Sequence, residues 1–183
     1  MDIYSLFKLL HVVCAIAWVG GGLTLLAYSA LITRTRGELE TLRTLDAMNT
    51  LGKAWFMPAS LMTLVFGVIA AVLGGMWMDF WVLLGLAGFA ATFFTGFFVL
   101  EPTGRAVAQL IEADRLPEAL SKGLYLLRVS KFDYTVMMVV VADMVLKPTW
   151  ADLPLIAVFA AIVAAGAWLF LYGGKLPART QTA

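Results

Sequence analysis

Five stretches of mostly apolar residues follow one another along this chain, and each approaches or exceeds the length of a membrane span. A transmembrane helix needs about 20 predominantly apolar residues. The stretches are Ile3–Ile32, Trp55–Leu73, Phe80–Leu100, Leu124–Leu146 and Leu153–Tyr172. The fourth is the least apolar, because Arg128, Lys131 and Asp133 interrupt its start. The pattern predicts an all-α protein, a polytopic membrane bundle of five transmembrane helices.

The two longer polar linkers carry a helical pattern of their own. In Arg36–Lys53 apolar residues recur every third position between charges, at Leu39, Leu42, Leu45 and Met48. Such a narrow stripe suits a helix lying at the membrane surface. Thr103–Arg115 has an apolar and a polar side, and Pro117 fits the first turn of the helix that follows. We therefore expect two short cytoplasmic interfacial helices.

Lysine and arginine residues are concentrated in alternate connections. The linkers after the first and third stretches and the C-terminus hold Arg34, Arg36, Arg43, Lys53, Arg105, Arg115, Lys122, Arg128, Lys131, Lys175 and Arg179. Gly74–Asp79 has none, and the connection around Lys147–Asp152 has a single lysine. Because cytoplasmic loops are enriched in these residues, the N-terminus is predicted outside and the C-terminus in the cytoplasm.

Composition agrees with a membrane protein. The chain of 183 residues is 62% hydrophobic and 14% charged, with a mean hydropathy of +0.90, far more apolar than a soluble domain. We expect one integral membrane domain over 1–183, multi-pass in the cell membrane (the inner membrane of a bacterium), with the lipid bilayer as partner. A homodimer or larger membrane complex stays open. The net charge of +1 and the lack of a basic tract predict no nucleic-acid partner.

The only histidine, His11, lies inside the first apolar stretch. Ionisable groups are costly in hydrocarbon, so one placed there is a functional candidate. Lys8 and Trp18 share its helix face by their three-and-four spacing. His11 is interpreted as a structural histidine, a proton carrier or a ligand of haem or metal. One imidazole suffices as an axial haem ligand, whereas zinc normally needs three or four protein ligands, and the single cysteine, Cys14, excludes a four-cysteine metal site.

A polar cluster is also predicted in the outer half of the bundle. The topology places Lys8 and His11 of the first helix at the same depth as Asp143 and Lys147 of the fourth. An ion pair between Lys8 and Asp143 would offset the desolvation cost of both charges. Lys8 extending to the lipid headgroups is the alternative. Charges of the inner half are interpreted as membrane anchors and ion-pair partners: Glu101, Arg105, Arg128, Lys131 and Asp133.

The opening Lys8-x-x-His11-x6-Trp18-x-Gly20-Gly21 resembles the first helix of the CopD-like membrane superfamily. That group includes the copper-resistance D proteins, the HemJ-type protoporphyrinogen oxidases and several branches without an assigned function. The later run Asp143-Met144-Val145-Leu146-Lys147-Pro148 is most similar to one of those branches, predicted integral membrane proteins of unknown function.

The HemJ-type resemblance implies four to five helices, b-type haem held by a membrane histidine, and electron removal from a tetrapyrrole. His11 would then be the axial ligand, Lys8 a cation for a porphyrin propionate, and Trp18 part of the pocket wall. The arginine and second histidine that end the HemJ-type first helix are absent here. A sixth ligand would come from solvent, Lys, Met, or His11 of a second subunit.

Three functional hypotheses follow, and none decides whether the protein is an enzyme. The leading one is a membrane redox or ligand-binding protein with haem b at His11. The second is a cofactor-free accessory protein in which Lys8 and His11 pair with Asp143. The third is copper handling, because the thioethers of Met76 and Met78 suit Cu(I).

Overall fold

The structure is a computed structural model that describes residues 2–173, and every regular element in that range is helical. In chain order the elements are α1 (Ile3–Ala15), η1 (Ile16–Gly20), α2 (Gly21–Thr35), α3 (Glu38–Leu51), η2 (Gly52–Phe56), α4 (Met57–Leu73), α5 (Phe80–Thr95), η3 (Gly96–Leu100), α6 (Glu101–Glu112), α7 (Leu116–Leu146), α8 (Leu153–Ala167) and η4 (Trp168–Tyr172). The η elements are π-helical turns: η1, η2 and η3 each join two α-helices without a break, and η4 continues α8. Lys175 and Arg179, on which the topology prediction drew, lie outside the described residues.

Four continuous helices are long and apolar enough to cross a membrane: Ile3–Thr35, Glu38–Leu73, Phe80–Glu112 and Leu153–Tyr172. The helix α7 has 31 residues and carries four charges in its apolar part, at Arg128, Lys131, Asp133 and Asp143. At 1.5 Å per residue it is about 46 Å long, enough to span the hydrocarbon core of about 30 Å. The all-helical, membrane-type architecture expected from the sequence is therefore present.

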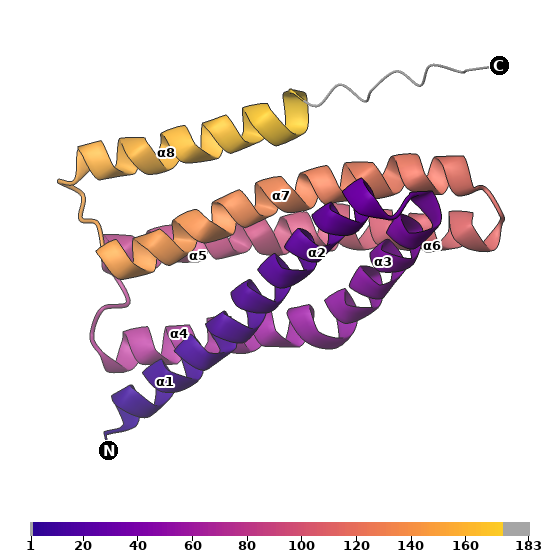
Figure 1. Cartoon of the computed structure of the whole chain (residues 1–183). Coiled ribbons are helices and arrows are strands. Elements are labelled where there is room, and N and C mark those ends of the chain that lie inside the picture. Colours follow the sequence, from indigo (N-terminus) through magenta and orange to yellow (C-terminus); the bar gives the residue numbers. More distant parts are fainter. Residues whose placement is uncertain (1, 174–183) are drawn as a thin grey trace.

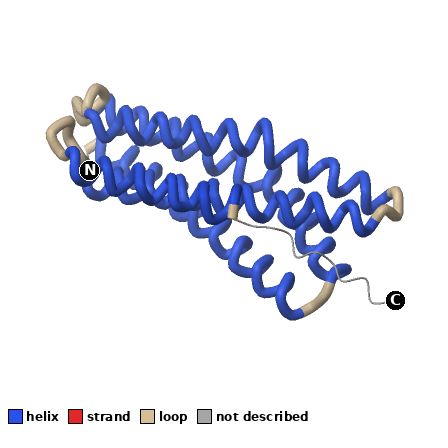
Figure 2. Tube along the Cα trace, turned by 90° about the horizontal axis from the view of Figure 1, so that it is seen from above, coloured by secondary structure: helices blue, strands red, loops and turns tan. Residues whose placement is uncertain are grey.

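The loops lie at two ends of an elongated bundle (Figures 1 and 2). One end, here called the N-terminal end, holds the N-terminus and the loops α4–α5 and α7–α8. The opposite end holds the turns α2–α3 and α6–α7. Successive long helices therefore run in alternating directions.

The helix α7 is central, which explains how it tolerates its charges. It packs against α2, α3, α5, α6 and α8, whereas α8 lies on the outside against α7 (Figure 1). A helix surrounded by protein can keep polar groups that a lipid-facing helix would not. The weak apolar signal of 124–146 thus marks an interior helix.

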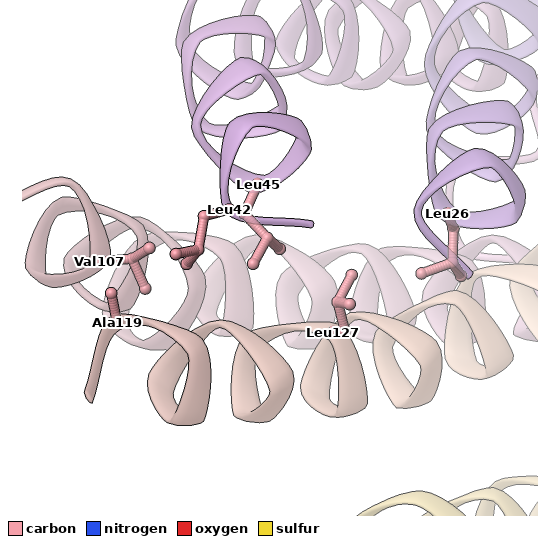
Figure 3. Packing of buried hydrophobic residues seen from close by; sticks show 6 residues of the cluster. All are labelled: Leu26, Leu42, Leu45, Val107, Ala119 and Leu127. Atoms are coloured by element: carbon pink, nitrogen blue, oxygen red, sulfur yellow. The ribbon is translucent and has the colours of Figure 1, made fainter. Parts of the chain in front are cut away.

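The two predicted interfacial helices are helical but differ from the prediction. Glu38–Leu73 and Phe80–Glu112 are unbroken helices, so α3 and α6 extend α4 and α5 and are not separate. Leu42 and Leu45, only 2% and 4% exposed, pack against α6 and α7 with Val107, Ala119 and Leu127 (Figure 3). The apolar stripe faces protein because a neighbouring helix pair offers the same apolar surface that a bilayer would.

Candidate functional site

His11 faces the helix α4, against which α1 packs. Its Nδ1 lies 2.7 Å from the backbone carbonyl oxygen of Thr63. A Cβ at Gly67, one turn further along α4, would lie only 2.7 Å from Nδ1. The absence of a side chain at Gly67 therefore lets the imidazole approach the α4 backbone.

This contact fixes the roles of the two ring nitrogens. A carbonyl oxygen can only accept, so Nδ1 carries the proton and donates it to Thr63. In the neutral ring Nε2 then keeps its lone pair. A backbone partner at Nδ1 is the usual arrangement that orients a histidine whose Nε2 binds a metal.

His11 lines a cavity of about 580 Å³ between α1, α4, α5 and α7, here called the His11 cavity. Lys8, Trp18 and Lys147 line it as well, so the structure brings together four of the five residues that the sequence singled out. The volume falls within the range of about 300–1,000 Å³ typical of small-molecule sites. Most of its other wall residues are apolar, as is usual for such sites.

The two lysines of the His11 cavity are exposed and rest beside aromatic rings. The Nζ of Lys8 lies 5.8 Å from the ring centre of Tyr4, and the Nζ of Lys147 lies 4.9 Å from that of Trp81. Lys147 ends α7 in a left-handed conformation with φ of 49°. Both ammonium groups are available to an anionic group of a ligand.

Asp143 does not join this cluster. Its side chain is 1% exposed, and neither carboxylate oxygen has a hydrogen-bond partner among the described residues. It lies towards α5, where a Cβ at Gly85 would be 3.2 Å from Oδ2. The ion pair with Lys8 is not formed, and Asp143 meets Lys147 only through the backbone, where the Lys147 N–H donates to the Asp143 carbonyl.

Trp18 belongs to the π turn η1 and packs edge-on against Phe89, with ring centres 5.5 Å apart. It lines the His11 cavity and also a second, smaller cavity nearer the opposite end. Thr92 and Met137 share this double position. These three side chains form the wall between the two cavities.

The charged residues at the opposite end have three kinds of environment. Glu101 pairs with Lys53 at 3.5 Å and with Arg105 at 2.5 Å, as expected of ion-pair partners. Arg128 donates to two backbone carbonyls of η4, each at 3.0 Å. Asp133 differs from the prediction: it is buried, and no ion pair joins it among the residues that the structure describes.

Two contributors to these sites, Thr63 and Gly67, were missed by the sequence reasoning, and a third, Asp133, was noted only as a charge of the inner half. Thr63 acts through its backbone carbonyl, which no side-chain pattern reveals. Gly67 matters only because His11 faces it across two helices. Asp133 did leave a signal, because an aspartate inside an apolar run indicates an interior helix.

Metal chemistry with hard or borderline ligands has little support in this part of the chain. Within residues 2–173 no group of three or more His, Cys, Asp or Glu side chains is placed to hold a metal ion. Cys14 is a free, partly buried thiol.

Comparison with protein-family models, curated proteins and solved structures found no match to this chain.

Proposed function

We propose that this protein is a multi-pass membrane protein that binds one haem b in the His11 cavity, with Nε2 of His11 as an axial ligand. The observation that carries the proposal is the hydrogen bond from Nδ1 to Thr63, which orients the ring and leaves Nε2 free. The CopD-like resemblance of the first helix supports the same cofactor.

The residues present fit the group. The His11 cavity has the volume of a small-molecule site and mostly apolar walls. Lys8 and Lys147 offer two cations, and haem b carries two propionates. The thioethers of Met137 and Met144 also line the cavity. They are candidate sixth ligands, so a second subunit is not required.

Haem held by these residues would supply reversible one-electron chemistry or the binding of a small ligand. The chain itself would hold the ring by its imidazole, balance the propionates with its lysines and exclude water with Trp18 and Phe89.

The proposal is tested by haem titration of the purified protein in detergent. We expect a Soret band at one haem per chain, lost in His11→Ala. Thr63→Ala is the matched control, because it keeps the backbone carbonyl that orients His11. Lys8→Met and Lys147→Met should each weaken binding by about 2–5-fold, the worth of an exposed ion pair.

Two results would overturn haem binding. One is the absence of a Soret band when haem is supplied to folded protein. The other is a His11→Ala variant that binds haem as tightly as the native chain.

Copper handling is a second candidate, favoured by one observation. The thioethers of Met76, Met137 and Met144 line the same cavity as His11, and thioether and imidazole ligands suit Cu(I). Competition with a coloured Cu(I) chelator tests it. Replacing the three methionines by leucine should abolish Cu(I) uptake while leaving the His11–haem titration measurable.

The proposed orientation places the N-terminal end outside the cell membrane of a bacterium. Apart from Lys8 and Lys147, every lysine and arginine of the chain falls in or beside the other connections and the C-terminus. Single cysteines at Asp79 and Asp152, in a Cys14→Ser background, should react with an impermeant reagent on whole cells. Cysteines at Glu40 and Glu118 should not, and the reverse pattern would invert the orientation.

A further inference from the structure

A second cavity of about 210 Å³ lies beyond the wall formed by Trp18, Thr92 and Met137. It is here called the Asp133 cavity, after the buried carboxylate that lines it. Asp133 is 7% exposed. Burying a carboxylate without a partner is costly, and a group that lines a cavity in this state is a candidate to bind an ion or a ligand there.

The charge balance of the cavity identifies what is missing. Among its described lining residues the charged ones are Lys53, Glu101 and Asp133. Both cations near Glu101 are engaged by it: Lys53 pairs with Glu101 at 3.5 Å, and Arg105, outside the cavity lining, pairs with it at 2.5 Å. No ion pair joins Asp133 among residues 2–173, so an occupant that pairs with it directly carries a positive charge.

The remaining walls indicate an apolar, aromatic body for that occupant. The rings of Trp18, Phe56, Phe93, Phe97 and Tyr134 line the cavity. Aromatic faces attract cations and pack well against other rings. An apolar cavity of about 150 Å³ is enough for benzene, so this one accommodates a phenyl ring with a short amine arm.

The helix geometry around this cavity is irregular in a way that ordinary packing does not require. Three π turns contribute to its lining: Trp18 from η1, Gly52, Lys53 and Phe56 from η2, and Gly96, Phe97 and Leu100 from η3. Single π turns within α-helices occur frequently at functional sites. Phe97 is also 53% exposed on the flank of the bundle, which gives the cavity a side that faces the bilayer.

We propose that the Asp133 cavity binds a small lipophilic organic monocation, an arylalkylammonium, whose ammonium group pairs with Asp133 and whose ring packs among the aromatic side chains. This site is separate from the one proposed for haem.

The test is isothermal titration of the full chain in detergent with 2-phenylethylammonium and with neutral 2-phenylethanol. The two probes share a ring and an arm and differ in charge. We expect the ammonium to bind about 10–100-fold more tightly, the range of a hydrogen bond to a charged partner. Equal binding of both probes, or no binding of the ammonium, would overturn the proposal.

Asp133→Asn should remove the preference for the ammonium and leave the binding of 2-phenylethanol unchanged. Asp143→Asn is the matched control, because Asp143 is a buried aspartate of the same helix that lines neither cavity. An Asp133→Asn variant that keeps the preference would contradict the assignment. The comparison of the two probes on the unaltered chain tests the proposal even if this variant does not fold. Haem titration of the same samples separates this outcome from that of the His11 proposal.

Discussion

The two cavities share a wall but hold their polar groups in opposite states. In the His11 cavity the imidazole is fixed by a backbone carbonyl, and its second nitrogen is free. In the Asp133 cavity no ion pair joins the carboxylate among the residues that the structure describes. The first arrangement suits a ligand whose metal ion needs an electron pair from a nitrogen in a fixed orientation. The second suits a ligand that brings its own charge.

The source of this difference lies in the helices that carry the two groups. His11 is on α1, which packs closely on α4, so a glycine and a carbonyl of the neighbour can be matched to it. Asp133 is on the central α7, where the surrounding side chains are mostly apolar or aromatic. Close contact between helix backbones provides hydrogen-bond partners for His11. The aromatic side chains around Asp133 provide a surface for packing but no charge that would balance the carboxylate.

The largest expected effect comes from removing the shared wall. Trp18→Ala would join the two cavities and remove the contact with Phe89. Trp→Ala in a core costs about 3–5 kcal/mol, and for the half-buried Trp18 we expect a loss of about 2 kcal/mol in the free energy of unfolding. Both haem and ammonium binding should weaken together.

Thermal unfolding in one detergent, with titration of both probes, measures these effects. Trp168→Ala is the control, because Trp168 is 72% exposed and lines neither cavity. If the two variants unfold alike and bind alike, Trp18 does not separate the cavities.

The second prediction sharpens the comparison at the histidine. Gly67→Ala would push a methyl group against the imidazole and break the bond to Thr63. Because the hydrogen bond is lost and the ring is strained, the free energy of unfolding should fall by about 1–2 kcal/mol. Haem affinity should fall with it, while 2-phenylethylammonium binding stays unchanged.

Gly20→Ala is the matched control for this change. Gly20 lines the same cavity, but a Cβ there meets nothing within 4 Å. Because alanine is favoured over glycine in helices, Gly20→Ala should be stabilising by about 0.5–1 kcal/mol. Equal effects of the two substitutions would show that Gly67 does not set the position of His11.

Much of the fold was accessible from the sequence because hydrophobic length is a strong local signal. The five apolar stretches correspond to the helices that the structure contains, and Pro117 lies in the first turn of α7 as expected. Lys8, His11 and Trp18, which helical periodicity places on one face, all line the His11 cavity, although Trp18 lies in the π turn η1.

The remaining features depend on contacts between elements, which local patterns do not encode. Gly52 and Gly96 mark places where a helix usually weakens, yet both helices continue through π turns. The stripe of Leu42 and Leu45 suits a lipid surface and a neighbouring helix equally well. The depth match between Lys8 and Asp143 was no guide to contact, because depth leaves the direction of each side chain undetermined.

The third prediction uses Asp143 to separate two views of buried charge. An unpartnered carboxylate in the protein interior destabilises the folded state, because the group has lost its hydration without gaining a partner. Asp143→Asn should therefore raise the free energy of unfolding by about 1 kcal/mol, with Lys8→Met additive to it. A formed ion pair predicts the opposite, a loss of about 3–5 kcal/mol and strong coupling between the two changes. A double-mutant cycle measured by thermal unfolding distinguishes them.

The smallest expected effect concerns Asp2, which caps the helix that carries His11. The backbone N–H and the hydroxyl of Ser5 donate to its carboxylate, at 2.6 Å and 3.2 Å. These bonds favour the charged form and lower the pKa of Asp2 below its ordinary value of 3.8. The stabilisation is therefore complete above that value and is lost as the pH falls through the lowered pKa. Asp2→Asn, which retains a good cap, should unfold like the native chain at pH 7 and lose this acid dependence. Asp2→Ala should melt at a slightly lower temperature than the native chain at pH 7, and this difference should disappear at low pH. A pH-independent difference between the native chain and Asp2→Ala would show that the cap does not act through its charge.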